Sequence, residues 1–308
     1  MTNKPVQEAE AAMPVVVTRE TPEPSQVQVM TYTINERQAN AALLQLKTAK
    51  DGSAYVVRYS LLARILHFLL LVAVTGLAFT GLAQILYGTV IGGFFLRLLG
   101  GLDETQGIHH AFALLLAVVV VFHVLDIMES LFVRRQVPAM LPVRIDFQSF
   151  MQKLKFDLGV SKKQPRFGRY SFEEKAVYWL LSIGVVVLGL TGVVQLFPIQ
   201  VTEFLPGISI PASGIIHRWE AILVMVVVFI WHFYQVLYRK MDVSIFSGKK
   251  SLEDMQLEHP LELEYLQKAA AAVGSPTWPV MVEVEFNPPD EKKMEPAPVD
   301  GAAKKGSE

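Results

Sequence analysis

Long apolar stretches alternate with polar ones through the middle of the chain. Four of them are each long enough to cross a bilayer, which takes about 20 residues of helix; they lie at roughly residues 61–84, 108–132, 176–197 and 215–238. The pattern predicts an all-α integral membrane protein with a four-transmembrane-helix bundle and polar tails. Residues 1–57 are polar, with Pro and Glu early, and are expected to be disordered at first. Residues 273–308, rich in Pro, Lys and Glu, are typical of a tail.

The four spans form an internal repeat. The segments RYSLLARILHFLLLVAVTGLAFTGLAQ, from Arg58, and RYSFEEKAVYWLLSIGVVVLGLTGVVQ, from Arg169, share their Arg-Tyr-Ser, Thr-Gly and Gln positions at a shift of 111 residues. The spans that follow, GIHHAFALLLAVVVVFH and IIHRWEAILVMVVVFIWH, also correspond. The sequence therefore predicts two repeated helical hairpins. Small residues that would allow close helix contacts are Gly76, Gly81, Gly184, Gly189 and Gly192.

The Lys and Arg residues between the spans predict the orientation. The loop 134–175 carries ten of them, whereas the loop 85–107 has only Arg97 and the loop 198–214 has none. Positively charged loops stay in the cytoplasm, so the basic loop and both termini are expected there. The predicted organisation is an N-terminal cytoplasmic extension, a transmembrane domain and a C-terminal cytoplasmic tail, at residues 1–57, 58–240 and 241–308.

Two short connecting segments also have a recognisable character. FQSFMQKLKFDL, within the basic loop, alternates apolar and basic positions as an interfacial amphipathic helix would. VIGGFFLRLLGG, at residues 90–101, is expected at the outer surface.

Composition narrows the possible chemistry. With 52% hydrophobic residues and a mean hydropathy of +0.35, the chain is too apolar for an ordinary soluble domain. Its net charge of −1 suggests no nucleic-acid partner. The absence of cysteine excludes disulfides, thioether-attached haem and cysteine-ligated iron–sulfur clusters within this chain. Any metal must therefore be held by His, Met, Asp or Glu.

The histidines are the candidate ligands, because ionisable groups in hydrocarbon are costly and usually functional. Steps of 14 residues from His109 to His123 and of 15 residues from His217 to His232 correspond to about 21 and 22 Å of helix. Both steps return to roughly the same helix face. His109 and His217 should then share an outer level, and His123 and His232 an inner level. Counted inward from the start of its span, His67 also reaches the inner level.

Two levels of facing histidines suit two haems, each with two imidazole ligands and no open position for oxygen. Three histidines, His67, His123 and His232, are candidates for the two ligand positions of the inner haem. Internal symmetry favours His123, because the residue equivalent to His67 in the second repeat is Tyr178. His110 misses the ligand face, and His259 lies in a polar helical stretch. Gln84 and Gln195 fit helix ends, and the candidates for a quinone pocket are Gln235, Tyr178 and Lys175.

The spans resemble those of the b-type cytochrome subunits of membrane-bound formate dehydrogenases and nickel–iron hydrogenases, over roughly residues 55–267. The resemblance lies in the Arg-x-x-His of the first span, the Thr-Gly ends of the first and third, and the paired histidines of the fourth. It implies two haem b groups and exchange of electrons with a membrane quinone. It further implies that His109 and His217 hold the outer haem iron and that His67 and His232 hold the inner one, with His123 the alternative to His67.

The same resemblance implies a subunit of a respiratory oxidoreductase complex in a bacterial or archaeal cytoplasmic membrane. Its expected partners are membrane lipid, quinone and other redox subunits that carry iron–sulfur clusters or cytochrome c; an electron-transfer subunit is expected rather than an enzyme alone. A transporter or proton relay would need acidic residues deep in the spans, which have almost none. A haem-free membrane anchor would leave the matched histidines unexplained.

Overall fold

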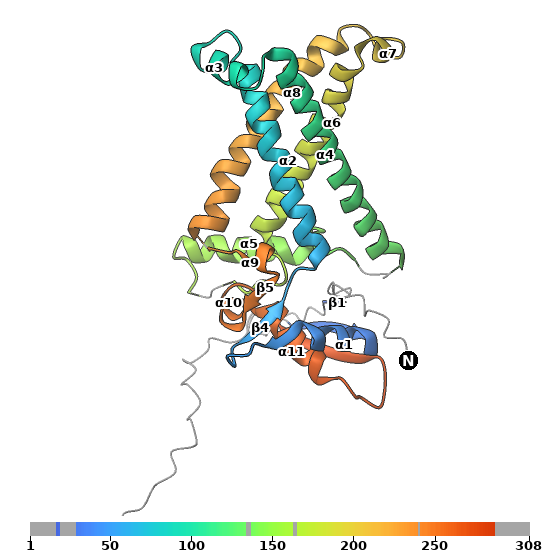
Figure 1. Ribbon diagram of the computed structural model, residues 1–308. Helices are drawn as coiled ribbons and strands as arrows, with labels where there is room; N and C mark the ends of the chain where they lie inside the picture. The colour runs from blue at the N-terminus through green and yellow to red at the C-terminus, as the bar shows by residue number, and fades with distance from the viewer. Residues whose placement is uncertain (1–16, 19–28, 134–136, 163–164, 240, 287–308) are drawn as a thin grey trace, which may run out of the picture.

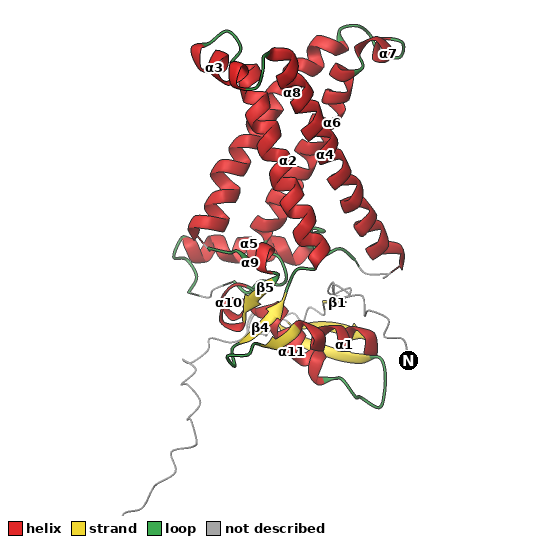
Figure 2. Ribbon diagram, in the orientation of Figure 1, coloured by secondary structure: helices red, strands yellow, loops and turns green. Residues whose placement is uncertain are grey.

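The computed structural model describes residues 17–18, 29–133, 137–162, 165–239 and 241–286. Four long helical segments form a bundle (Figures 1 and 2), and each is long and apolar enough to cross a membrane. They are α2 (Leu61–Ile85), α4 (Leu102–Met128) with the π-helical turn η1 (Glu129–Val133), α6 (Phe172–Leu196), and α8 (Ser209–Val226) with η2 (Val227–His232) and η3 (Tyr234–Arg239). The predicted all-α membrane bundle is confirmed.

The two hairpins repeat each other down to their hydrogen bonds. Both α2 and α6 have 25 residues. The side chains of Ser60 and Ser171 cap them by accepting backbone N–H groups at 3.2 and 3.3 Å. In the last turn, the Gln84 and Gln195 amides donate to main-chain carbonyls at 3.3 and 3.4 Å. The predicted repeat is therefore present in the folded chain.

Short helices cover both ends of the bundle (Figure 1). The helices α3 (Val90–Leu98) and α7 (Pro198–Thr202) lie at one end. At the other end α5 (Arg144–Asp157) runs across the bundle, so the predicted amphipathic segment is a helix. The Lys175 ammonium on α6 fixes α5 through a buried ion pair, 2.8 Å from the Asp146 carboxylate.

The two polar ends of the chain fold together into one unit, here called the terminal unit (residues 29–57 and 244–286). It contains β2 (Val29–Ile34), β3 (Leu46–Thr48), β4 (Ala54–Val57), β5 (Lys249–Ser251) and β6 (Val280–Glu285), with α1 (Glu36–Gln45), α9 (Ser244–Ser247), α10 (Leu252–Glu258) and α11 (Pro260–Ala271). The sheet orders are β1-β2-β6, where β1 is Val17–Thr18, and β3-β4-β5. Each sheet thus joins the beginning of the chain to its end.

Residues 280–285, within the segment expected to be a polar tail, form the strand β6. This strand pairs antiparallel with β2, from Val29 opposite Glu285 to Ile34 opposite Val280. Its side chains alternate between a buried face, with Val282 and Val284, and an exposed one. Six residues of alternating burial are a weak sequence signal for a β-strand when the partner strand lies far away in the sequence. The disorder expected at the start of the chain falls mainly outside the described residues.

Side-chain burial separates the two parts of the molecule. The terminal unit has its own hydrophobic core, in which Tyr32, Met255 and Tyr265 are almost fully buried. In the bundle, large apolar side chains such as Leu114 and Leu190 point outward and are more than half exposed. An apolar surface of this extent requires a lipid environment.

Candidate functional site

Four of the predicted histidines form two facing pairs inside the bundle. His109 on α4 and His217 on α8 make the outer pair, whose ring centroids are 6.5 Å apart with an angle of 70° between ring planes. His67 on α2 and His232 in η2 make the inner pair, at 6.4 Å and 43°. The terminal unit lies at the end of the bundle where α2 begins (Figure 1), and its Phe246 ring contacts the ring of His67.

The separations within both pairs match two ligands of one metal ion. A bond from a metal to an imidazole nitrogen is about 2.0 Å long, and the ring centroid lies roughly 1.2 Å beyond that nitrogen, so imidazoles on opposite sides of a metal have centroids about 6.4 Å apart. Both pairs are within 0.1 Å of this separation. Each gap is therefore wide enough for one iron between two imidazoles.

Two imidazoles are too few to hold a bare metal ion. Among the described residues, no group of three or more His, Asp or Glu side chains could act as a metal site. In a haem the porphyrin supplies the remaining ligands of the iron, so the protein needs to provide only the axial ones. The donor set in each pair therefore fits a b-type haem with two axial histidines.

Hydrogen bonds fix the orientation of the outer imidazoles. The Thr80 hydroxyl lies 2.8 Å from Nδ1 of His109, and the Thr191 hydroxyl lies 3.0 Å from Nδ1 of His217. Each hydroxyl also contacts a carbonyl in the preceding turn of its own helix at 2.7 Å, that of Gly76 or Val187.

These contacts also determine the tautomer of both outer histidines. A carbonyl oxygen can only accept a hydrogen bond, so each threonine hydroxyl donates its single hydrogen to that carbonyl. The threonine oxygen must then accept a proton from Nδ1–H of the imidazole. Nε2 is left with its lone pair free, which is the form in which a histidine binds a metal.

The glycine after each threonine lies beside the same rings. A Cβ atom built on Gly81 would lie 3.4 Å from Cε1 of His109, and one on Gly192 would lie 3.4 Å from Cε1 of His217. At this distance a Cβ atom would be in ordinary van der Waals contact, so each glycine lies against the edge of a histidine ring. Both residues of the Thr-Gly motif therefore lie next to a histidine of the outer pair.

His123 does not join the inner pair. Its Nε2 lies 2.8 Å from the hydroxyl of Tyr178 on α6, too close to leave room for a metal between the two atoms. The repeat relates α2 to α6 and α4 to α8, so the His123–Tyr178 pair occupies the position equivalent to His67–His232 in the other half of the bundle. The structure brings His67, not His123, to His232.

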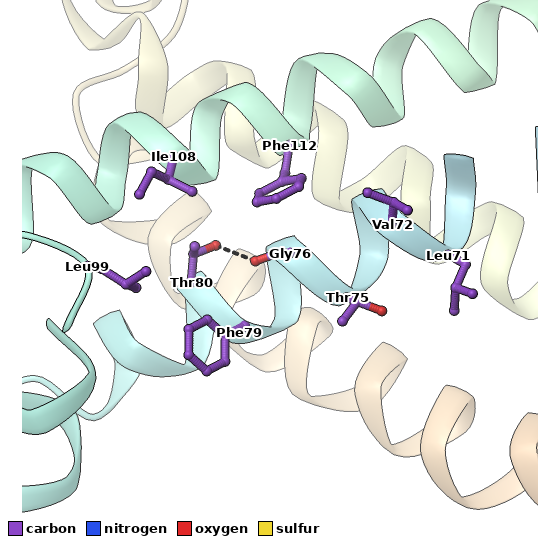
Figure 3. A pocket seen from close by; sticks show the side chains of 9 residues that line it. All are labelled: Leu71, Val72, Thr75, Gly76, Phe79, Thr80, Leu99, Ile108 and Phe112. Atoms are coloured by element: carbon purple, nitrogen blue, oxygen red, sulfur yellow. Dashed lines mark hydrogen bonds between the residues drawn. The ribbon is translucent and has the colours of Figure 1, made fainter. Parts of the chain in front are cut away.

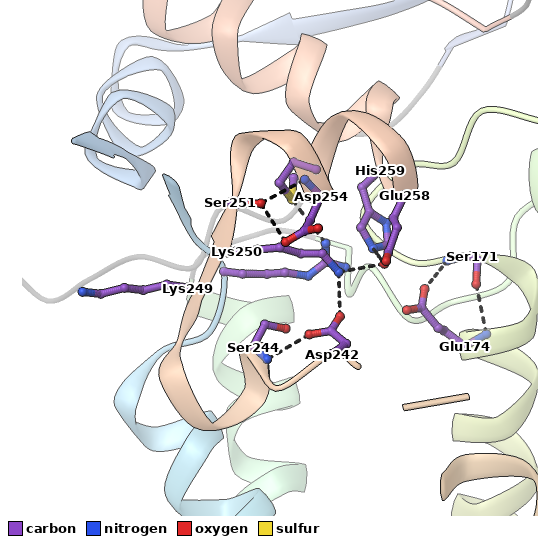
Figure 4. A network of polar contacts seen from close by, with 12 residues as sticks. Ser171, Glu174, Asp242, Ser244, Lys249, Lys250, Ser251, Asp254, Glu258 and His259 are labelled. Carbon is purple, nitrogen blue, oxygen red and sulfur yellow. Dashed lines mark hydrogen bonds and ion pairs between the residues drawn. The ribbon is translucent and has the colours of Figure 1, made fainter. Parts of the chain in front are cut away.

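The remaining histidines lie elsewhere. His110 is exposed beside the outer pair. His259, between α10 and α11, is fully buried in the terminal unit, with Nδ1 2.8 Å from the carbonyl oxygen of Gly168. It sits beside a polar network in which the Lys250 ammonium binds Asp242 at 2.6 Å and Glu258 at 2.8 Å (Figure 4).

All three candidates for a quinone pocket make other contacts, including Gln235. Lys175 is held by Asp146, and Tyr178 by His123. An apolar groove of about 420 Å³ lies along α2 and α4 on the outer half of the bundle (Figure 3). Thr80 and Gly76 both line this groove, and the Thr80 hydroxyl donates a hydrogen bond to the Gly76 carbonyl.

Comparison with known proteins agrees with the geometry of the site. The sequence profile of the family described as prokaryotic cytochrome b561 matches residues 58–245, which include all four spans and both histidine pairs. No curated protein matches the chain. Because the profile covers more than half of the sequence, the chain belongs to the prokaryotic cytochrome b561 family, and it is a membrane cytochrome b that binds haem b and transfers electrons.

Proposed function

We propose that this cytochrome holds two haem b groups at two depths and exchanges electrons between a membrane quinone and a partner redox subunit. The observation that carries the proposal is the equal ring separation of the two pairs, 6.5 Å for His109 and His217 and 6.4 Å for His67 and His232. Each separation fits a six-coordinate iron.

The protein's contribution is to hold ligands and fix the distance between the two sites. A b haem supplies reversible one-electron transfer when it is bound. The two imidazoles of each pair would both bind the haem iron and leave no ligand position for oxygen, which favours electron transfer.

The side of the membrane follows from charge. The described part of the basic loop 134–175, which includes α5, lies at the same end of the bundle as the terminal unit (Figure 1). Positively charged loops stay inside. We place this end in the cytoplasm of a bacterial or archaeal cell, so that the outer pair faces the opposite side. Partner subunits with iron–sulfur clusters or cytochrome c would complete a respiratory oxidoreductase complex.

Single His→Ala variants with spectral counting of haem test the proposal. The purified wild-type protein should give about two low-spin haems per chain in a pyridine haemochrome assay. Replacing any one of the four ligands removes a coordinate bond, so one haem should be lost or become high-spin; these ligands are His67, His109, His217 and His232.

His123→Ala is the matched control, because His123 lies in a span but pairs with Tyr178. This variant should retain both low-spin haems. Two low-spin haems per chain in His217→Ala would overturn the proposal of two haems at two depths. Loss of the inner haem in His123→Ala but not in His67→Ala would overturn the inner assignment alone.

Quinone exchange needs a separate measurement. Adding a quinol analogue to the oxidised protein should reduce haem in membranes or detergent. Two low-spin haems that no quinol or quinone can reduce or oxidise would restrict the chain to transfer between protein partners.

A further inference from the structure

The two histidine pairs differ in the hydrogen bonds that their imidazoles make. In the outer pair, both rings donate from Nδ1 to threonine hydroxyls, Thr80 and Thr191. In the inner pair, Nδ1 of His67 is buried and has no partner among the described residues. The His232 ring contacts aromatic rings there, those of His67 and Phe233.

We propose that Thr80 and Thr191 are positioning residues that hold the outer haem at a lower reduction potential than the inner haem. The proposal rests on the proposed dihaem function. It assigns these two hydroxyls a role in setting the order of the potentials, in addition to fixing the ligand tautomer.

The physical reason lies in the electron density of the ligand. An imidazole that donates its Nδ1–H to an acceptor becomes a more basic ligand through Nε2. A more electron-rich axial ligand stabilises ferric iron more than ferrous iron, which makes the one-electron reduction less favourable. Hydrogen bonding around the ligands is one of the ways in which proteins tune haem potentials. Both ligands of the outer haem receive this effect and the inner ligand His67 does not.

Charged residues near the two sites act in the same direction. Glu220 follows His217 by one helical turn on α8, and its carboxylate oxygen lies 3.0 Å from the position of a Cβ on Gly184 of α6. A carboxylate within the bundle, one helical turn from His217 and two turns along α6 from Thr191, favours the ferric state of a haem close to it. The neighbouring Arg218 is exposed at the surface, where its charge is screened more strongly.

On the inner side the nearby charge is positive. Arg64 precedes His67 by one turn of α2, and its Nε donates to the carbonyl oxygen of Phe246 at 2.8 Å. The ring of Phe246 contacts the His67 ring, with centroids 6.0 Å apart. A guanidinium beside the inner pair favours the ferrous state. Transfer of an electron from the outer to the inner haem is then downhill.

The two threonines are not equivalent in their effect. The Thr80 hydroxyl lies 2.8 Å from Nδ1 of His109, whereas the Thr191 hydroxyl lies 3.0 Å from Nδ1 of His217. Removing the Thr80 hydroxyl should therefore change its ligand more than removing the Thr191 hydroxyl.

Potentiometric titration of the purified dihaem protein tests the proposal. Thr80→Val keeps the shape of the side chain and removes the acceptor. We expect the lower-potential wave to rise, by about 59 mV if the ratio of ferric to ferrous stability changes tenfold, while the upper wave stays in place. Thr191→Val should raise the same wave by less.

Two controls separate the hydrogen bond from general disturbance of the helix. Thr80→Ser keeps the hydroxyl and should leave both waves unchanged. Thr75→Val removes an exposed hydroxyl from the same helix and should also change nothing. If the valine variants lose haem, Thr80→Ala and Thr191→Ala, which place no methyl groups against the ring, give the same comparison.

The outcomes distinguish this inference from the proposed function. Absence of two low-spin haems from the wild-type protein would overturn the proposed function. Two low-spin haems whose lower wave does not move in the valine or alanine variants would overturn the role of the threonines alone. A shift confined to the upper wave would show that the outer haem has the higher potential, and would overturn the proposed order.

Discussion

Arg58 and Arg169 occupy the same position in the two repeats, and each guanidinium donates a hydrogen bond to the main-chain carbonyl of the other residue. The bond from Arg169 to Arg58 is 2.7 Å long. Both arginines also bind one carboxylate, that of Glu262 on α11, at 3.3 Å from Arg58 and 2.9 Å from Arg169. The two hairpins thus meet through their repeated Arg-Tyr-Ser motifs, and the terminal unit binds both at this point.

The chemistry of this contact explains why a carboxylate can be buried there. Burial alone would raise the pKa of Glu262, but the two guanidinium groups, Arg58 and Arg169, outweigh it and hold the pKa below its usual value. One negative charge between two positive ones also reduces the repulsion between the arginines. The carboxylate therefore links the terminal unit to the inner ends of both hairpins.

Replacing this carboxylate should loosen the terminal unit. In Glu262→Gln the two buried arginines lose their counter-charge, and breaking a buried pair in this way typically costs about 3–5 kcal/mol. We expect faster hydrogen exchange in β2 and β6 and earlier proteolysis of the terminal unit. The haem content should not change, because the proposed ligands lie within the spans.

The matched control is Glu264→Gln, two residues along the same helix. Glu264 pairs with Arg166 at 3.0 Å and with Lys268 at 2.7 Å, in positions that are partly exposed to solvent. Pairs of this kind contribute about 0–1 kcal/mol. Equal hydrogen exchange in the two variants would show that the contact of Glu262 with the two arginines adds nothing to the stability of the terminal unit.

Acid should destabilise the terminal unit through His259. Burial and the nearby guanidinium of Arg58 lower the pKa of this imidazole to about 4. The unfolded chain therefore binds a proton that the folded chain does not, at any pH between about 4 and the ordinary value near 6.5. Stability should be complete above that ordinary pKa and fall by about 1.4 kcal/mol for each pH unit through this range.

Hydrogen exchange in β6 as a function of pH measures this effect. His259→Asn places an amide where it can still donate to the carbonyl of Gly168 but cannot titrate. Its profile should be flatter between pH 6.5 and 4. The same acid transition in the asparagine variant would assign it to other groups.

The sequence predicted the parts of the fold that depend on local pattern. Apolar length and the repeat located all four spans, and helix periodicity placed the histidines at two depths. The pairing could not be predicted, because His67 and His123 reach the same level and internal symmetry favoured His123, whereas the structure places His67 beside His232. Tyr178, which replaces histidine in the second repeat, takes His123 as its own hydrogen-bond partner.

The terminal unit was missed for a different reason. Its strands are three to six residues long. Two of them, β2 and β4, pair with strands about 200 residues or more further along the sequence. Neither half has an apolar periodicity strong enough to stand out from a polar extension. Thr80 and Thr191 were missed as ligand partners because a threonine near a helix end also fits a simple structural role.

The close contact between α2 and α4 should depend on Gly76. A Cβ atom at this position would lie 2.5 Å from the ring of Phe112, so an alanine forces the ring or the helix to move. Overpacking of this kind costs about 1–3 kcal/mol. Gly76→Ala should lower the thermal midpoint of the haem-loaded protein, measured by loss of the low-spin spectrum.

Gly189→Ala provides the comparison within the other hairpin. The sequence suggested a close contact at Gly189 too, but a Cβ atom there would have nothing within 4 Å. This substitution should leave the thermal midpoint unchanged or raise it slightly, since alanine favours the helix more than glycine does. A similar loss in both variants would attribute the Gly76 effect to something other than the Phe112 contact.

The orientation can be tested because the chain has no cysteine of its own. Glu203 is exposed at the end of α7, and Ser53 is exposed in the turn between β3 and β4 of the terminal unit. Ten Lys and Arg residues in the loop 134–175 predict that the end of the bundle near Ser53 is cytoplasmic. A maleimide that cannot cross the cytoplasmic membrane is applied to cells whose outer layers it can pass. It should therefore label Glu203→Cys and not Ser53→Cys. After the membrane is broken both variants should react, which shows that each thiol is accessible. Labelling of Ser53→Cys in intact cells, with protection of Glu203→Cys, would reverse the orientation and exchange the outer and inner haem sites.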